Sequence, residues 1–134
     1  MIAFFDTNIL VYAQQEGEKA EISQDLIERG GRISAQVLNE MANVLGKKSG
    51  RNWDEIALAL ADIERALEPV SPLTAKTTVG ALVLARDHGL AFYDALIVAS
   101  AIEDGCDTLY SEDMQHGRRF GRLVIVNPFL PGTP

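Results

Sequence analysis

The sequence predicts an α/β fold, a three-layer α/β/α sandwich around a parallel sheet of about four to five strands. Short apolar runs at 2–6, 108–111 and 123–126 alternate with longer stretches of helical periodicity. Strands separated by helices favour a parallel sheet that is covered on both faces. The 134 residues, 47% of them hydrophobic, suit one compact domain. We expect a single domain over 1–130 and a frayed tail at 131–134.

Each element has a local signal. Phe4 and Phe5 raise the strand propensity of the first run, and glycines follow three of the helical stretches. Ser34 is a suitable N-cap for the third helix, and Asn52 or Ser49 for the fourth. The expected helices span 7–15, 19–29, 35–47, 53–67, 74–88 and 93–104, and the expected strands span 2–6, 31–34, 108–111 and 123–126.

Composition narrows the class of protein. No run of about 18 apolar residues occurs and the N-terminus lacks a basic signal region, so we expect no membrane span and a cytoplasmic location. The single cysteine, Cys106, cannot form an internal disulfide and is expected to be a buried thiol. A net charge of −7 argues against non-specific binding of nucleic acid, unless the acids surround a cation.

Three acidic residues occupy positions that point to a functional site. Asp6 ends the first strand and Asp113 lies just past the strand at 108–111, so both are expected at the edge of the sheet where ligands bind. Glu40 falls on the same helical stripe as Val37 and Val44. A carboxylate on an apolar stripe is costly unless a cation or strong donors meet it.

A fourth acid, Asp94, opens the helix at 93–104 with apolar residues on its face, so we expect it to point inward. Plainer interpretations exist: Asp6 and Asp94 as helix N-caps, Asp113 as a turn residue, and Glu40 at the edge of its stripe. These are independent of one another, whereas one site explains all four acids. Clustered carboxylates favour Mg²⁺ or Mn²⁺, and no zinc-type Cys/His cluster is present.

The segments that carry these acids resemble a known family. FFDTNILVYA, SAQVLNEMANVL, YDALIVASAIEDGCDTLYSEDMQHG and VNPF resemble the PIN-domain ribonucleases, and most closely the VapC toxins of bacterial toxin–antitoxin pairs. The resemblance extends from Met1 to Phe129. It implies a three-layer sandwich, a Mg²⁺ or Mn²⁺ site, cleavage of RNA, and a homodimer that a cognate antitoxin holds inactive. Transfer, ribosomal and messenger RNA are all substrates within the family.

The resemblance also assigns residues. Asp6, Glu40, Asp94 and Asp113 match the acidic quartet of the family, and Thr7 and Ser111 match the polar positions beside it. We expect the three aspartates to hold the ion, Glu40 to orient water or a second ion, and the two hydroxyls to fix the carboxylates. Two basic clusters are either solvated loops or contacts to RNA phosphates; they comprise Lys47, Lys48 and Arg51, and His116, Arg118 and Arg119.

Two rival functions remain. A phosphatase with Asp6 as nucleophile would need a second aspartate two residues on, where this chain has Asn8. A binding module that grips a partner would need no metal at all.

Two helical regions, 7–28 and 53–67, carry more apolar residues than a small sheet face needs. We therefore expect Ile56, Leu60 and Ile63 to form part of a groove for an antitoxin segment or a homodimer interface.

Overall fold

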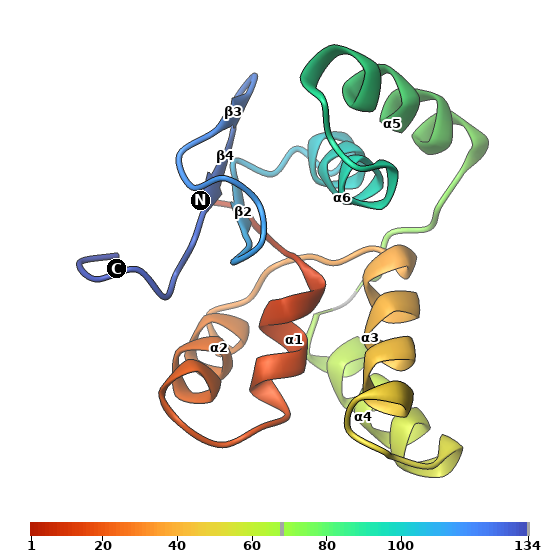
Figure 1. Ribbon diagram of the computed structural model, residues 1–134, viewed down its shortest axis with the longest axis vertical. Helices are drawn as coiled ribbons and strands as arrows, with labels where there is room; N and C mark the ends of the chain where they lie inside the picture. The colour runs from red at the N-terminus through yellow and green to blue at the C-terminus, as the bar shows by residue number, and fades with distance from the viewer. Residues whose placement is uncertain (68, 134) are drawn as a thin grey trace.

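Helices and short strands alternate along the chain as expected, and the computed structural model describes residues 1–67 and 69–133. Figure 1 shows α5 lying beside α6, α1 beside α2, and α3 beside α4 around the strands. The elements are β1 (Ala3–Phe5), α1 (Thr7–Ala13), α2 (Glu18–Glu28), α3 (Ala35–Lys47), α4 (Trp53–Ala66), α5 (Ala75–His88), α6 (Phe92–Glu103), β2 (Thr108–Tyr110), β3 (Arg119–Phe120) and β4 (Leu123–Val126).

The sheet has four strands in the order β1-β2-β4-β3. The first three are parallel, with Phe5 opposite Tyr110 and Tyr110 opposite Val126 at their C-terminal ends. Parallel strands need crossover connections: helices α1 to α6 connect β1 to β2, and a loop with the short strand β3 connects β2 to β4. The expected three-layer α/β/α sandwich is therefore confirmed, and the three parallel strands end together at one edge of the sheet.

Helix ends follow the chemistry of their caps. Asn52 and Glu55 form a reciprocal capping box at the start of α4, and Thr74 forms a similar one with Thr77 at the start of α5. Gly89 ends α5 in the left-handed conformation, with φ of 69°. The six expected helices are confirmed, with ends that differ by at most two residues.

Two strand predictions differ from the structure. Residues 31–34 form no named strand and make only isolated bridges from Arg32 to Phe4 and from Ser34 to Ser71. Conversely, β3 was not expected; it pairs antiparallel with β4 across a loop that begins at Gly121, where φ is 62°. A strand of two residues in a polar segment has too few side chains to show alternation.

The core lies between the sheet and the helices. Phe4, Phe5, Met41, Ile97 and Ile125 are fully buried there. Cys106 is buried, as expected, and burial raises the pKa of its thiol to about 11.

Ile56 and Ile63 belong to this core, with exposed fractions of 3% and 5%, and Leu60 packs partly buried against it. The expectation that Ile56 and Ile63 form a partner groove is therefore wrong, while the expected contact of the partly buried Leu60 stays a prediction. Ile56 and Ile63 face inward because the apolar stripe of α4 serves the fold itself.

The end of the chain is described only as far as Thr133, whose backbone N–H donates to Leu130 at 3.2 Å. Residue 134 of the expected frayed tail lies outside the described residues. Among the helices within the described residues, none has the length and hydrophobicity that crossing a membrane requires.

Candidate functional site

Asp6 and Ser111 meet at the edge where the parallel strands end. Asp6 directly follows β1 and Ser111 directly follows β2, and the register places the last residues of these strands side by side. The Ser111 hydroxyl donates to Asp6 Oδ2 at 2.7 Å and accepts the Met114 N–H at 3.2 Å. Both residues are buried, so the Ser111 hydroxyl donates its proton to the Asp6 carboxylate rather than to water.

Asp6 is also the N-cap of α1. Its Oδ1 accepts the Thr7 backbone N–H at 2.7 Å. Asp6 is therefore a helix cap, as the plainer interpretation expects, and this role is compatible with its place in the functional site. Burial raises the pKa of Asp6 to about 6; the Ser111 and Thr7 hydrogen bonds lower it, while Asp94 and Glu40 raise it further. A carboxylate in this position is poised to exchange its proton for a cation.

Two donors fix the carboxylate of Glu40. The Thr7 hydroxyl donates to Oε1 at 3.1 Å, and the Gln36 amide donates to Oε2 at 2.9 Å. Gln36 lies one helical turn before Glu40 on α3, so the two share a face. The sequence analysis missed Gln36, although its spacing of four from Glu40 was a usable signal.

Asn8 connects two of the aspartates. Its amide donates to Asp113 Oδ2 at 3.1 Å and to Asp6 Oδ2 at 3.3 Å, while its oxygen accepts the Glu112 backbone N–H at 3.2 Å. Asn8 thus links the start of α1 to the loop that carries Asp113. The sequence offered Asn8 only as an argument against a phosphatase, and its bridging position depends on contacts between distant segments.

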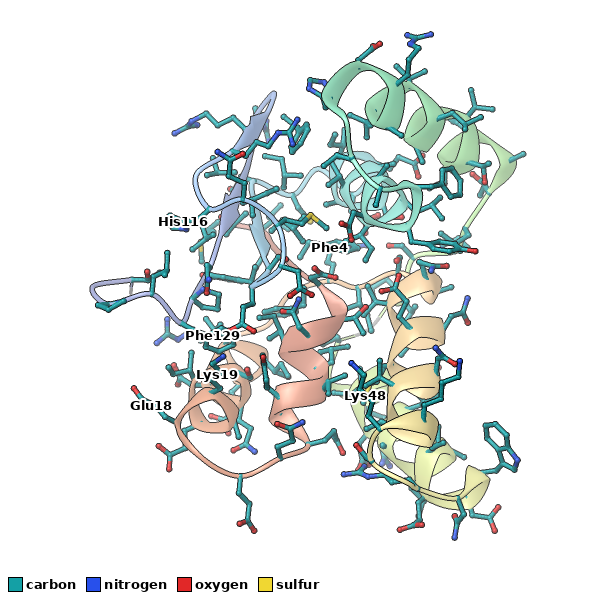
Figure 2. All side chains as sticks on the ribbon, viewed as in Figure 1. Phe4, Glu18, Lys19, Lys48, His116 and Phe129 are labelled. Atoms are coloured by element: carbon teal, nitrogen blue, oxygen red, sulfur yellow. The ribbon has the colours of Figure 1, made fainter. Side chains whose placement is uncertain are left out.

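The loop after β2 is held from the other side as well. The Tyr12 hydroxyl donates to Glu112, and the Lys19 ammonium pairs with the same carboxylate. Lys19 lies 4.9 Å from the centre of the Tyr12 ring and 5.4 Å from that of Phe129. Figure 2 shows Lys19 on α2 beside Phe129.

Asp94 lies in the first turn of α6, three residues after the N-cap Ala91, and it is half-buried. Its position in the first turn suits the helix dipole but rules out a capping role. Burial raises the pKa of Asp94, and the carboxylates of Glu40 and Asp113 raise it further. Glu40 and Asp113 therefore each lie within electrostatic reach of Asp94.

All four predicted acids line one cavity of about 410 Å³. They come from four separate segments: the end of β1, α3, α6 and the loop after β2. Thr7, Asn8 and Tyr12 of α1 line the same cavity. Segments far apart in the sequence therefore bring four carboxylates to one solvent-accessible hollow.

The donor set suits a hard divalent cation, because all the charged ligands are carboxylates and Asp6 is buried among like charges. Within the described residues, no three His, Cys, Asp or Glu side chains converge closely enough on one point to hold an ion. Three of the four acids are half-buried or exposed. All four line one open cavity with oxygen donors only, so their chemistry fits a divalent ion.

The two basic clusters differ in position. Lys48 lines the acidic cavity, while Lys47 and Arg51 line a neighbouring hollow. In the second cluster, His116 Nδ1 accepts the Asn127 backbone N–H at 2.9 Å, and Arg118 donates to the carbonyl of His88. None of His116, Arg118 and Arg119 lines the acidic cavity. Of the six basic residues, the structure therefore brings only Lys48 to the acidic cavity, with Lys47 and Arg51 in the adjoining hollow.

Comparison with known proteins agrees with this geometry. The family model of the PIN domain matches residues 3–120. No curated protein matches the chain.

Three solved structures share the fold. Mycobacterium tuberculosis VapC20, described as a sarcin–ricin loop cleaving toxin, is 22% identical with a TM-score of 0.69, covering 83% of this chain and 89% of its own. VapBC2 from Rickettsia felis, bound to a DNA fragment from its promoter, is 24% identical with a TM-score of 0.67, covering 93% and 97%. A toxin–antitoxin complex from Klebsiella pneumoniae is 20% identical with a TM-score of 0.70, covering 95% and 98%. On the match of its sequence over residues 3–120, the chain belongs to the PIN-domain family.

Proposed function

We propose that this chain is a Mg²⁺- or Mn²⁺-dependent endoribonuclease that acts as the toxin of a toxin–antitoxin pair. The observation that carries the proposal is the single cavity lined by Asp6, Glu40, Asp94 and Asp113 in a PIN domain. Carboxylates alone would repel an RNA phosphate. A site that gathers four of them suits phosphate chemistry only when a cation neutralises their charge.

Asp6, Asp94 and Asp113 would hold the ion. When bound, a divalent ion lowers the pKa of its water and offsets the charge of the phosphate. Ser111 and the Thr7 N–H hold Asp6 in one orientation, and Asn8 holds Asp113 beside it. These contacts fix the carboxylates before substrate arrives, which lowers the cost of assembling the site.

Glu40 would orient the attacking water. Thr7 and Gln36 each donate to one of its oxygens, which leaves further lone pairs free to accept a proton from water. Hydrolysis then forms a bond from the water oxygen to phosphorus and breaks the bond from phosphorus to the leaving ribose oxygen. Because both donors fix its orientation, Glu40 is a positioned base.

The fold neighbours support the biological role. One is described as a sarcin–ricin loop cleaving toxin, and another as a toxin–antitoxin complex. We therefore propose RNA as substrate, a cognate antitoxin as inhibitor, and a homodimer as the working assembly.

Cleavage of a total-RNA pool tests the proposal. The purified chain should give discrete fragments with Mn²⁺ or Mg²⁺ and none with EDTA, and Asp6→Asn should give none under any condition. The control is Asp25→Asn, which removes an exposed carboxylate that pairs with Arg29 on α2. Equal cleavage by wild type and Asp6→Asn would exclude the acidic cavity as the active site.

A further inference from the structure

Trp53 is the only tryptophan in the chain and one of its most exposed apolar side chains. It is the first residue of α4, and 80% of its surface is exposed. The apolar stripe of α4 is buried through Ile56 and Ile63, so Trp53 is not needed for the core. A large aromatic ring left in water is typical of a contact surface.

The ring borders a hollow of about 400 Å³ that has no acid in its lining. The other lining residues are Ala42, Asn43, Gly46, Lys47, Arg51 and Asn52. In a chain of net charge −7, two cations beside one aromatic ring make a local basic site. The two acids that follow Trp53, Asp54 and Glu55, do not line this hollow, and Glu55 accepts the Asn52 N–H at 3.1 Å in the capping box.

This hollow adjoins the acidic cavity across the last turns of α3. Glu40, Val44 and Lys48 recur every four residues on the face that lines the acidic cavity, while Asn43, Gly46 and Lys47 line the other hollow. Figure 2 shows Lys48 on the side of α3 that faces α1. Glu40 and Lys48 are about 12 Å apart along the helix axis, within reach of a short stretch of nucleic acid.

We propose that Trp53 stacks on an unpaired base of single-stranded RNA, while Lys47 contacts a neighbouring phosphate. The inference rests on the proposed ribonuclease function and adds a contact surface for the substrate outside the acidic cavity. Arg51 plays a smaller part, because its guanidinium already donates to Gln14 Oε1 at 3.0 Å and to the Gln14 carbonyl at 3.3 Å. Paired RNA is excluded here, because its bases are stacked within the helix and their faces are closed to a side chain.

Charge and composition favour RNA over a protein partner at this hollow. Among its lining residues two, Lys47 and Arg51, are cationic, one is aromatic, and none is acidic. A helix from a protein partner would need a row of apolar pockets. Binding of single-stranded nucleic acid requires an aromatic side chain for a base to stack on and cations near the phosphates, and this hollow has both.

Intrinsic fluorescence tests the inference, because Trp53 is the only indole in the chain. The probe is a short oligoadenylate in EDTA, which stops cleavage. The oligomer should quench the wild-type fluorescence to saturation. In a separate measurement, the anisotropy of a labelled oligomer, Trp53→Ala should lower the binding affinity by about tenfold or more. Trp53→Phe should retain most of the affinity, and the matched control Leu58→Ala, another apolar side chain exposed on α4 at 69%, should bind as wild type.

The salt dependence tests Lys47 separately. Lys47→Gln should reduce the slope of log affinity against log salt by about one, while Lys76→Gln on the exposed surface of α5 should leave it unchanged. Unquenched fluorescence together with unchanged affinity of Trp53→Ala would overturn the stacking site. So would a change in sedimentation of Trp53→Ala without a change in RNA affinity, which would make the surface an interface between copies of the chain.

Cleavage assays on the same proteins separate this inference from the ribonuclease proposal. Metal-dependent cleavage with no role for Trp53 in binding would contradict only the stacking site. Trp53-dependent binding without metal-dependent cleavage would contradict the enzyme and retain the RNA surface.

Discussion

At the scale of the residue, Asp6 combines a structural and a chemical role. Oδ1 caps α1 and Oδ2 accepts the Ser111 hydroxyl, so both oxygens are held in place. Only 3% of the residue is exposed, and burial among other acids keeps its pKa raised at about 6. The folded state therefore binds a proton at Asp6 more tightly than the unfolded chain does.

Without metal, this proton linkage sets the pH dependence of stability. A folded pKa of about 6 against an ordinary value of 3.8 means that Asp6 favours folding at low pH, and that this contribution is lost as pH rises from about 4 through 6. The difference between these two pKa values corresponds to a change in the free energy of unfolding on the order of 3 kcal/mol. In urea unfolding with EDTA, the stability of Asp6→Asn relative to wild type should rise across this window. A difference that does not vary with pH would contradict the assignment.

Asn8 is predicted to position two catalytic carboxylates. Asn8→Ala removes the amide that joins Asp6 to Asp113 and the acceptor of the Glu112 N–H, so activity should fall by about 10- to 100-fold with the fold retained. The measurement is kcat on a defined RNA fragment, with melting followed by circular dichroism. Asn39→Ala, exposed on α3, is the control and should remain active. Wild-type kcat in Asn8→Ala would remove Asn8 from the site.

At the scale of the element, parallel strands and their register assemble the site. The chain leaves β1 and β2 at the same edge of the sheet, which is why the placement of Asp6, next to β1, and Asp113, in the loop after β2, could be predicted from sequence. Glu40 was predictable because a carboxylate on an apolar stripe stands out. Asn8 and Gln36 were missed because polar residues at a helix start or on a helix face have many ordinary uses.

The same scale explains the errors. Ile56 and Ile63 gave an apolar stripe, but periodicity does not tell whether such a stripe meets the core or a partner. The hairpin of β3 and β4 had a signal in Gly121, which takes positive φ at the start of a two-residue loop. The shortness of β3 hid that signal.

A glycine contact between segments gives a stability prediction. A Cβ on Gly31 would lie 2.4 Å from Cε2 of the buried Phe5 ring and 3.1 Å from the Ala3 carbonyl oxygen, so Gly31→Ala should destabilise the fold by about 1–3 kcal/mol. Gly80→Ala is the control, since nothing lies within 4 Å of its Cβ inside α5, and it should stabilise by about 0.5–1 kcal/mol. Urea midpoints measure both; a neutral Gly31→Ala would show that the ring moves freely.

At the scale of the whole molecule, an acidic chain must bind a polyanion. A net charge of −7 opposes RNA over most of the surface, so the acidic cavity and the α3–α4 loop have to overcome it locally. Lys47 and Lys48 lie in that loop region and form no ion pair with any described residue. The account therefore makes RNA affinity depend on both the ion and this loop.

That dependence can be tested without cleavage. Glu40→Gln should retain the three aspartates that hold the ion while losing the positioned base. Its affinity for single-stranded RNA, measured by anisotropy, should be several-fold higher with Mn²⁺ than with EDTA, because the ion joins carboxylate to phosphate. Affinity that is the same in both conditions would mean that RNA binds elsewhere.

Calorimetric titration of Mn²⁺ into the purified chain at neutral pH would show whether the carboxylate cavity is a divalent-cation site. Wild type and Asp25→Asn should bind Mn²⁺ saturably, and Asp6→Asn and Asp94→Asn should lose this binding. Binding that survives in both cavity variants, or a folded wild type that binds no Mn²⁺, would contradict a cation site in this cavity.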